Sequence, residues 1–370
     1  MRIKFENEAD ARLNAMLDHA ELLEEGFDVS ALKMLPGIRH SIVHRPTEEY
    51  SFLHEAAIIA YRGVLFASWY NCPKWELKGH TPIRGRRSAD GGGTWSEVEL
   101  LAEDPSDRLM YCPPVYGICD DSLYLLMNTM VAPDHMHSLE LYRYDEADGK
   151  FHFLRSMPVP FKLNTNVCRL NSGKLLLPGR IAEPDGFPNT PAVMISDSGR
   201  IDAAWRLVGI REDGNLPDGS KLVHPELSAV IRGDDITIFC RDDERNVPLI
   251  YRSADSGEHW SAPVTHDIPF SNSKIYSGVL SDGRAYVVGN LQPGRSRLGI
   301  FFTEPGGGVF THGGLLRDGY DKELDLYPQF SYPAAVEDSG TLYVIYTMQT
   351  KPDSETRGAM LTAIDLKRTR

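Results

Sequence analysis

The hydrophobic and polar positions divide the chain into two unequal parts near residue 37. In residues 1–35, apolar side chains recur at helical spacing among acidic ones, at Ala11, Leu13, Met16, Leu17, Ala20, Leu22 and Leu23. From about residue 38 the pattern changes to short β-rich runs separated by Gly, Pro, Asp and Asn, as in barrels, sandwiches and propellers. We therefore expect a helical N-terminal extension over residues 1–37 and one all-β domain over residues 38–370.

Within the β-rich part, one pattern returns six times: an apolar strand, a tight turn and a second apolar strand. These units begin near Ala56, Val115, Asn166, Leu227, Ser277 and Pro333, at intervals of 50 to 61 residues. Sequence repeats of roughly 40 to 50 residues are typical of propeller blades. We predict a six-bladed β-propeller whose ring is closed by residues 38–45 or by residues 359–365, with a seventh, weakly marked blade as the alternative.

A second repeated phrase is SADGGGTW at residues 88–95, which returns as SADSGEHW at residues 253–260, 165 residues later. Its Asp can cap backbone amides, its glycines adopt conformations that side chains disfavour, and its Trp can anchor a turn on neighbouring strands. The phrase therefore predicts a structural turn and carries no catalytic role. It resembles the Asp box, or BNR repeat, of the sialidase superfamily. That resemblance implies a sialidase-like propeller over nearly all of residues 38–366.

The composition argues against several classes of protein. The net charge of −13 disfavours nucleic acid as a partner, because phosphate binding needs a basic footprint. No run approaches the roughly 18 apolar residues of a membrane span. The polar N-terminus lacks the apolar core of a secretory signal, so we expect a cytoplasmic protein with no membrane association.

The Cys and His positions do not indicate a cofactor. The five cysteines are scattered, with no CxxC spacing, and predict neither a disulfide framework nor a zinc site: Cys72, Cys112, Cys119, Cys168 and Cys240. The run DHMH at residues 134–137 is interpreted as a polar loop, because two histidines one residue apart lack further placed ligands. We therefore expect no metal and no cofactor.

Candidate chemistry lies where the hairpins begin and end, because the inner strands of a propeller surround a central funnel. Glu226 precedes the fourth hairpin, and Arg241 follows it fifteen residues later. Arg295 and Arg297 come next, and Tyr332 precedes the last hairpin. The order Glu, Arg, Arg, Tyr resembles the active site of sialidases.

The role of each residue follows from the substrate of that family, a sugar with a carboxylate beside the anomeric carbon. Arginine forks bind such a carboxylate, and a neutral Tyr, which the anion does not repel, attacks while a Glu accepts its proton. The resemblance implies Tyr332 as the nucleophile and Glu226 as its base. It implies Arg241, with Arg295 or Arg297, as the carboxylate clamp.

The first hairpin departs from the sialidase pattern. Sialidases have an Arg-Ile-Pro motif there and an Asp acid/base about one hairpin later, whereas this chain reads FLHEAAII at residues 52–59 and has no Asp between His54 and Asp90. His54 and His80 stand in that region instead. Because His transfers protons near neutral pH, we expect His80 as the acid/base and His54 as a second catalytic candidate. Glu55 and Glu76 are candidates for substrate binding.

Three functions remain open at this point, all with a carbohydrate ligand that carries a carboxylate. The first is an exo-acting glycoside hydrolase that removes a terminal acidic sugar from a glycan. The second is a polysaccharide lyase for rhamnose-glucuronate or ulvan-type linkages, since the first-hairpin histidines resemble related propellers in which a His or Tyr removes the C5 proton. The third is a non-catalytic glycan-binding propeller. Arg180, at the end of an inner hairpin, is a further binding candidate.

Overall fold

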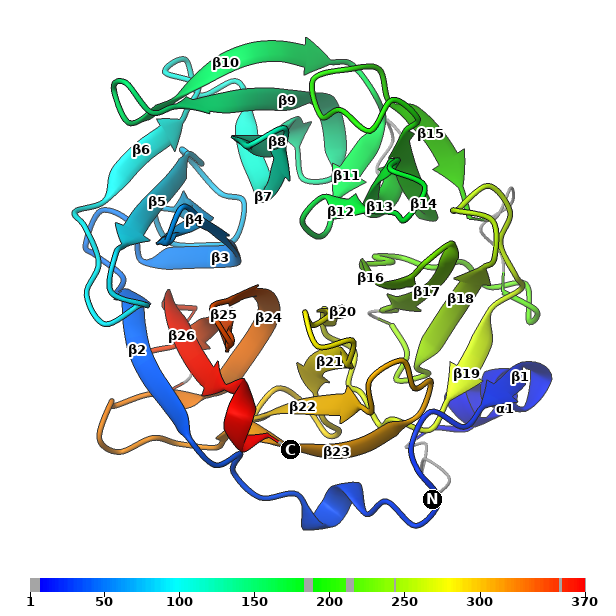
Figure 1. Ribbon diagram of the computed structural model, residues 1–370. Coiled ribbons are helices and arrows are strands. Elements are labelled where there is room, and N and C mark those ends of the chain that lie inside the picture. Colours follow the sequence, from blue (N-terminus) through cyan, green and yellow to red (C-terminus); the bar gives the residue numbers. More distant parts are fainter. Residues whose placement is uncertain (1–6, 183–188, 211–215, 243, 353–354, 370) are drawn as a thin grey trace.

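The computed structural model describes residues 7–182, 189–210, 216–242, 244–352 and 355–369, and it is a six-bladed β-propeller (Figure 1). Six sheets of mainly antiparallel strands surround a central axis, and from residue 52 onward the chain passes through them in sequence order. The prediction of six blades is confirmed. Apolar side chains of the strands fill the space between adjacent sheets and form a hydrophobic core between each pair of blades that they join.

Each blade begins with its innermost strand. Blade 1 contains β3 (Phe52–Tyr61), β4 (Val64–Cys72), β5 (Ile83–Ser88) and β6 (Glu99–Ala102). Blade 2 contains β7 (Met110–Cys119), β8 (Ser122–Ala132), β9 (His135–Asp145) and β10 (Lys150–Met157). In blade 3, β11 (Phe161–Leu163) and β12 (Cys168–Arg169) both pair with β13 (Leu175–Ala182), followed by β14 (Asn189–Ser196) and β15 (Arg206–Gly209).

The second half of the ring repeats the arrangement. Blade 4 contains β16 (Leu227–Arg232), β17 (Asp235–Cys240), β18 (Leu249–Ser253) and β19 (Val264–His266). Blade 5 contains β20 (Tyr276–Val279), β21 (Ala285–Asn290), β22 (Arg297–Thr303) and β23 (Phe310–Asp318). Blade 6 contains β24 (Tyr327–Asp338), β25 (Thr341–Gln349), β26 (Arg357–Asp365) and β2 (Ile38–His44).

The ring is closed by strands from both ends of the chain. The N-terminal β2 pairs antiparallel with the C-terminal β26, and the two lie side by side in Figure 1. Both segments that the sequence offered for closure therefore take part, β2 as the outermost strand of blade 6 and β26 as its neighbour. This pairing fixes blade 6 against blade 1 and leaves the sheet ring without an open seam.

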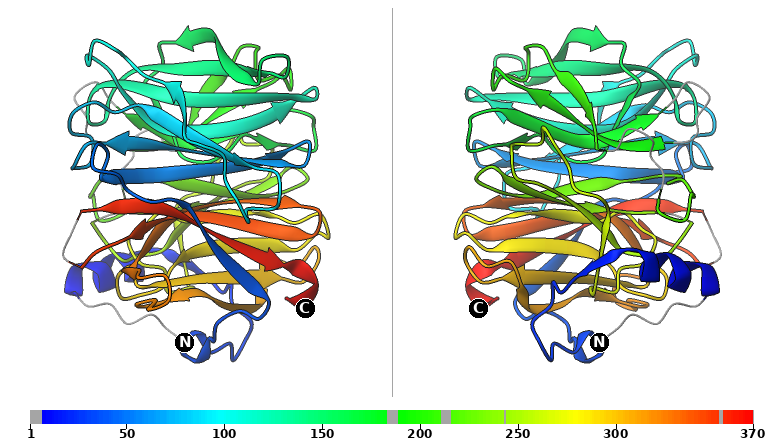
Figure 2. Two further views of the ribbon diagram at one scale, coloured as in Figure 1. Left: turned by 90° about the vertical axis from the view of Figure 1, so that its left-hand side faces the viewer. Right: turned by 90° about the vertical axis from the view of Figure 1, so that its right-hand side faces the viewer.

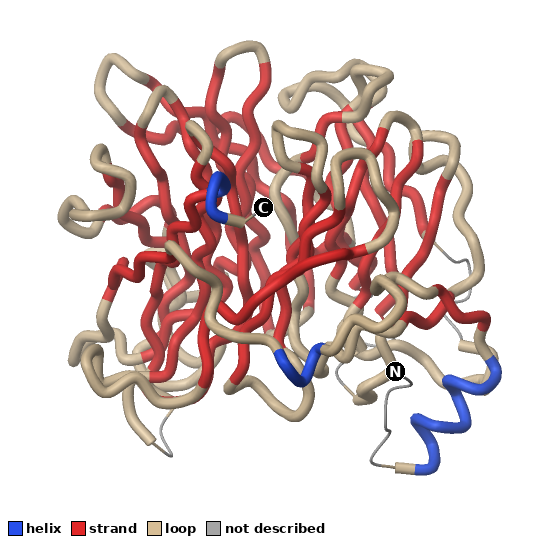
Figure 3. The backbone as a smooth tube through the Cα atoms, turned by 60° about the horizontal axis from the view of Figure 1, so that its bottom comes forward, coloured by secondary structure: helices blue, strands red, loops and turns tan. Residues whose placement is uncertain are grey.

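The segment before β2 lies along the outside of the ring (Figure 2). It forms one α-helix, α1 (Glu8–Met16), a short strand, β1 (Asp18–Ala20), which pairs parallel with β19 as a fifth strand of blade 4, and a 3-10 helix, η1 (Val29–Ala31). Figure 3 shows these helices outside the strands of the propeller. Leu13 of α1 is buried among side chains of blades 3 and 4. None of the helices in the described part of the chain is long and apolar enough to cross a membrane.

The two Asp boxes form the turns that the sequence predicts. In the first, Asp90 accepts a hydrogen bond from the Thr94 backbone N–H at 2.9 Å, and in the second, Asp255 accepts one from the His259 N–H at 3.0 Å. Gly92 has φ +81°, and a side chain there would collide with Leu361 of blade 6. These contacts are structural and lie at the β5–β6 and β18–β19 turns.

Candidate functional site

Three inner strands carry a β-bulge near their first residues. The pairing shifts between Ser331 and Ala334 in β24, between His54 and Ala57 in β3, and between Tyr111 and Pro114 in β7. Two residues within these bulges have positive φ although neither is glycine: Tyr332 at +58° and Glu55 at +46°. Bulges redirect side chains, and strained backbone of this kind concentrates at functional sites. The bulges therefore mark the end of the funnel where a site is built.

Arg241 connects two of the predicted site residues. Its Nη1 donates to the Tyr332 hydroxyl at 2.6 Å and to Glu226 Oε2 at 2.5 Å. The β16–β17 hairpin explains the second contact, because Leu227 pairs with Cys240 and the Arg241 N–H donates to the Glu226 carbonyl. All three side chains are buried. The structure thus brings together Glu226, Arg241 and Tyr332 from blades 4 and 6.

The Tyr332 ring is surrounded by positive charge. Arg241, Lys274 and Arg295 place their charged groups 5.6, 5.7 and 5.5 Å from its centroid. Burial raises the pKa of Tyr332 above its ordinary value, and the lowering effect of Arg241 and Arg295 does not outweigh it. The phenol is therefore neutral near pH 7, and its oxygen accepts a hydrogen bond from a guanidinium.

His54 lies against the same ring. The centroids of His54 and Tyr332 are 4.0 Å apart, and His54 Nδ1 lies 2.8 Å from the Thr347 hydroxyl. Burial lowers the pKa of His54 well below its ordinary value, and Arg295 and Arg357 add to that effect. His54 is therefore an uncharged imidazole within the site.

Glu55 is held by cations. The Lys274 ammonium lies 3.0 Å from Glu55 Oε2, and the Cys112 thiol lies 3.7 Å from Oε1. Burial by itself would raise the pKa of Glu55, but the charges of Lys274 and Lys162 outweigh it and lower the pKa. Glu55 is thus an ionised carboxylate that keeps acceptor capacity beside the nucleophile candidate.

Asp134 gathers a second group of charges. Lys162 and Arg180 contact its Oδ1 at 2.5 and 3.0 Å, and His224 Nε2 lies 3.0 Å from its Oδ2. Burial alone would raise the pKa of Asp134, but Lys162, His224 and Arg180 together lower it. Buried ion pairs contribute little net stability, so this concentration of charge at the funnel makes Asp134, Lys162 and Arg180 candidates for a functional site.

Glu76 lies in the β4–β5 loop and is exposed to solvent. The hydroxyl of the buried Tyr70 donates to Glu76 Oε1 at 2.9 Å. Although the residue as a whole is exposed, protein atoms crowded around its carboxyl desolvate that group and raise the pKa of Glu76, and Glu55 and Glu226 act in the same direction. An accessible carboxyl that retains its proton more readily than usual is suited to donate it.

A model of the BNR repeat-like domain matches residues 63–345. The chain belongs to the BNR repeat-like domain family. A search of the curated proteins found no match to this sequence.

Solved structures share the fold of this BNR propeller at low identity. A Dyadobacter fermentans protein of unknown function is 15% identical, covering 89% of this chain and 99% of its own, with a TM-score of 0.69. Trypanosoma rangeli sialidase is 15% identical over 90% of this chain, with a TM-score of 0.69, and the leech intramolecular trans-sialidase is 12% identical over 90%, with a TM-score of 0.67. The BNR propeller spans 61% and 71% of the lengths of those two enzymes. These similarities show a sialidase-type propeller fold.

Two of the predicted site residues, His80 and Arg297, contact partners outside the group around Tyr332. His80 contacts Asp107 through Nδ1 and Glu103 through Nε2, the latter at 3.0 Å. Burial alone would lower the pKa of His80, but Asp107 and Glu103 outweigh it and raise the pKa. Arg297, at the start of β22, lies 3.6 Å from Asp318. Among the described residues, neither side chain makes a hydrogen bond or ring contact with Tyr332, whereas Arg295 lies over its ring.

Sequence reasoning missed several charged residues of the site. Lys274 precedes the fifth hairpin as Glu226 precedes the fourth, so the same positional rule could have found it. Asp134 belongs to the run DHMH, which the sequence pattern indicates only as a polar loop. Arg357, at the start of β26, donates to Gln329 at 3.1 Å. It lies close enough to His54 to help lower its pKa, and close enough to Glu76 for their charges to interact. It comes from an outer strand, where the hairpin rule gives no signal.

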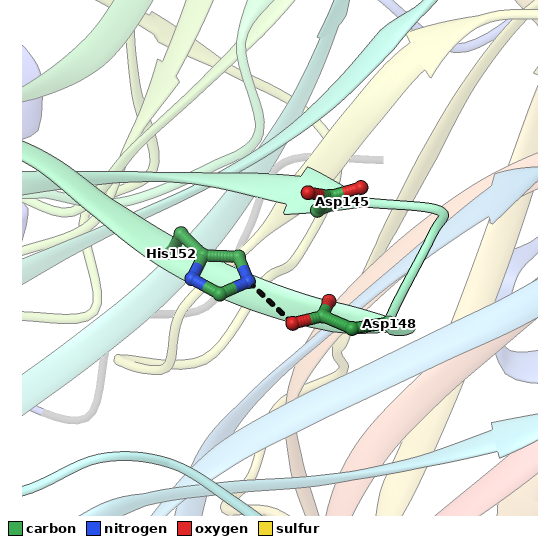
Figure 4. A group of neighbouring side chains, drawn as sticks. All are labelled: Asp145, Asp148 and His152. Atoms are coloured by element: carbon green, nitrogen blue, oxygen red, sulfur yellow. Dashed lines mark hydrogen bonds and ion pairs between the residues drawn. The ribbon is translucent and has the colours of Figure 1, made fainter.

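One group in the described residues brings three potential metal ligands together, Asp145, Asp148 and His152 at the β9–β10 turn (Figure 4). All three are exposed, and His152 Nε2 lies 2.8 Å from Asp148. Asp145 and Asp148 also accept backbone N–H groups of the turn, from Ala147 and Lys150. The three side chains stabilise the β9–β10 turn of blade 2 and do not belong to the group around Tyr332.

Proposed function

We propose that this protein is an exo-acting glycoside hydrolase that removes a terminal acidic sugar from a glycan. The observation that carries the proposal is the double contact of Arg241 with the Tyr332 hydroxyl and Glu226. A neutral phenol beside a carboxylate and several arginines is the arrangement that hydrolysis of an anionic sugar requires. The sialidase-type fold supports the same reaction class, since Trypanosoma rangeli sialidase has been solved with sialic acid.

The arginines provide the site for the sugar carboxylate. Arg241 and Arg295 approach Tyr332 from blades 4 and 5, and Arg357 of blade 6 lies close enough to His54 to help lower its pKa. A guanidinium fork binds a carboxylate bidentately, which fixes the anomeric carbon beside the phenol. The paired charges around Glu55 and Asp134 offer both donors and acceptors for the hydroxyl groups of the same sugar.

In the proposed reaction, the Tyr332 oxygen forms a bond to the anomeric carbon while the glycosidic bond breaks. Glu226 accepts the phenol proton, and Glu76 donates a proton to the leaving oxygen. Water then attacks the anomeric carbon and gives its proton to Glu76, and Tyr332 leaves with the proton that Glu226 returns. Two displacements at one carbon retain the anomeric configuration.

Glu76 takes the acid role in this proposal in place of His80. Desolvation of the carboxyl raises the pKa of Glu76, while the side chain still reaches solvent, and both features suit proton donation to a leaving group. His80 contacts two carboxylates of the β6–β7 loop, Glu103 and Asp107. A proton held by such an ion pair is a poor donor to a separate substrate.

The test is incubation of the protein with sialylated, rhamnosyl-glucuronate and other uronate-terminated oligosaccharides, with products read by mass spectrometry. We expect products that have gained one water and a terminal sugar released with retained configuration by NMR. Tyr332→Phe should lower turnover by at least about 10³-fold, because it removes the nucleophile. Undiminished turnover by Tyr332→Phe contradicts the proposed mechanism.

A uronate lyase is the second candidate, and the observation that favours it is the uncharged His54 against Tyr332. Either side chain could remove the C5 proton of a uronate while the arginines neutralise its carboxylate. The lyase product is unsaturated and lacks the added water, so the same mass spectra separate the two reactions. Ligand-dependent stabilisation without any product would instead indicate glycan binding alone.

A further inference from the structure

One backbone oxygen contacts two of the arginines at the site. The Asn272 carbonyl accepts from Arg241 Nε at 3.1 Å and from Arg295 Nη2 at 3.4 Å. Asn272 lies in the loop between β19 and β20, so a blade 4–blade 5 connection sets the direction of guanidinium groups from both blades. The position of this loop therefore determines where the two cations meet.

Asn272 is itself held by a second loop. The Asn272 N–H donates to Asn246 Oδ1 at 3.1 Å, and Asn246 lies in the β17–β18 loop. The Asn246 carbonyl accepts from Gln292 Nε2 at 3.0 Å, and the same Gln292 nitrogen donates to the Phe270 carbonyl at 2.9 Å. Three loops of blades 4 and 5 are thus joined by side-chain amides.

The network continues to the N-terminal helix. The Asn246 N–H donates to Asp10 Oδ2 at 3.2 Å, and Asp10 is only 2% exposed. Asn7, which caps α1, fixes Asp10: its Oδ1 accepts from the Asp10 N–H at 2.7 Å, and its Nδ2 donates to Asp10 Oδ2 at 2.9 Å. Leu13, about one turn further, anchors the helix in the core of blades 3 and 4.

We propose that Asp10, Asn246 and Asn272 form a relay that positions Arg241 and Arg295. The N-terminal helix is then part of the binding site, although it lies on the outside of the ring. Cations held in place before binding lose less freedom when an anion arrives, so the relay increases affinity without touching the ligand. The effect on acidic sugars rests on the proposed function, whereas the positioning of the two arginines does not.

The relay is tested in the full-length protein by phenylglyoxal modification of arginines, with the rate at each arginine measured by peptide mass spectrometry. Asn246→Ala removes the acceptor that holds Asn272. We expect the modification rates at Arg241 and Arg295 to rise about three- to tenfold. This is the factor that corresponds to the free energy of one lost hydrogen bond. Asn246→Asp keeps an acceptor oxygen and should restore rates close to those of the wild type.

Asp10→Ala provides an independent variant at the far end of the relay, and Asp28→Ala is its matched control. Asp28 belongs to the same N-terminal segment, and its carboxylate accepts hydrogen bonds from the Ser30 N–H and hydroxyl. Arg284, which is buried and paired with Asp282, serves as an internal reference. Asp10→Ala should raise the rates at Arg241 and Arg295 alone, and Asp28→Ala should change none of the three.

Unchanged rates at Arg241 and Arg295 in both Asn246→Ala and Asp10→Ala overturn the relay. An equal rise at Arg284 also overturns it, because the variants would then have loosened the whole fold. If wild-type protein turns over an acidic glycan, Asn246→Ala should raise KM more than it lowers kcat, since a carboxylate is bound in both ground and transition states. Absence of turnover would contradict the proposed function and leave the modification rates as the test of the relay.

Discussion

His54 of blade 1 and Tyr332 of blade 6 lie in direct contact, with 4.0 Å between their ring centroids. Each sits in the bulged part of an inner strand, and the two strands become neighbours only because the ring closes between blades 6 and 1. The closure by β2 and β26 therefore does more than complete the fold. It also places His54, which differs from the residue expected in sialidases, against Tyr332, which matches the sialidase pattern.

The buried state of His54 predicts a stability effect in acid. Because burial lowers the pKa of His54 in the folded protein, the unfolded chain binds this proton more readily. The uncharged His54 therefore contributes fully to the free energy of unfolding above the unfolded pKa of about 6.5, and this contribution is lost as the pH falls below that value. We expect the Tm of His54→Gln to fall less between pH 7.5 and pH 5 than that of the wild type. His152→Gln, at an exposed histidine, is the control; equal Tm losses in wild type and His54→Gln contradict the prediction.

His80 predicts the opposite dependence. Asp107 and Glu103 raise the pKa of His80 in the folded protein, against the effect of burial, so its protonated form stabilises the fold. That stabilisation is present below the unfolded pKa of about 6.5 and disappears as the pH rises through the folded pKa. His80→Ala should therefore lower the Tm at pH 5.5 more than at pH 8.5, while kcat changes less than about threefold. A loss of kcat of a hundredfold or more would instead make His80 the acid/base.

Glu76→Gln tests the alternative acid. We expect kcat on a natural glycan to fall by about 10²- to 10⁴-fold, because the leaving oxygen no longer receives a proton. An aryl glycoside with an acidic phenol as leaving group needs no such proton and should be affected far less. Glu103→Gln, on a neighbouring loop, is the matched control. An equal loss on both substrates would show that Glu76 does not act on the leaving group.

The sequence predicted the fold and the grouping of Glu226, Arg241 and Tyr332 for a physical reason. Hairpin repeats and Asp boxes are local patterns, and Glu226, Arg241 and Tyr332 all flank or begin the hairpins that those patterns locate. The structure adds Lys162, Asp134 and Arg357, whose types occur everywhere on protein surfaces and whose proximity arises only when six blades close into a ring.

The choice between Glu76 and His80 could not be made from sequence. Both lie in the β4–β5 loop, four residues apart, and either type of side chain transfers protons. Between them the backbone passes through positive φ at Leu77 (+50°) and Gly79 (+78°). Those turns direct Glu76 to Tyr70 and His80 to Asp107. A left-handed leucine is uncommon, so local sequence preference did not indicate this path.

Arg295 and Arg297 provide a matched pair for the last prediction. They stand two residues apart before and at the start of β22, yet Arg295 lies over Tyr332 and donates to Asn272, whereas Arg297 pairs with Asp318. Arg295→Lys should raise KM for an acidic glycan by about 10- to 100-fold, because the substitution removes one charge-assisted hydrogen bond and its free energy corresponds to that factor. Arg297→Lys keeps a charge beside Asp318 and should change KM by less than about twofold.

Steady-state kinetics on one acidic glycan decides between the two arginines. A carboxylate clamp built on Arg297 would reverse the ranking. Arg295 lies in the β21–β22 connection and Arg297 begins β22, so a general disturbance of this region would affect the two variants alike. A large effect confined to Arg295→Lys can therefore arise only from the contact that this guanidinium makes in the funnel, because lysine preserves the charge and removes the fork.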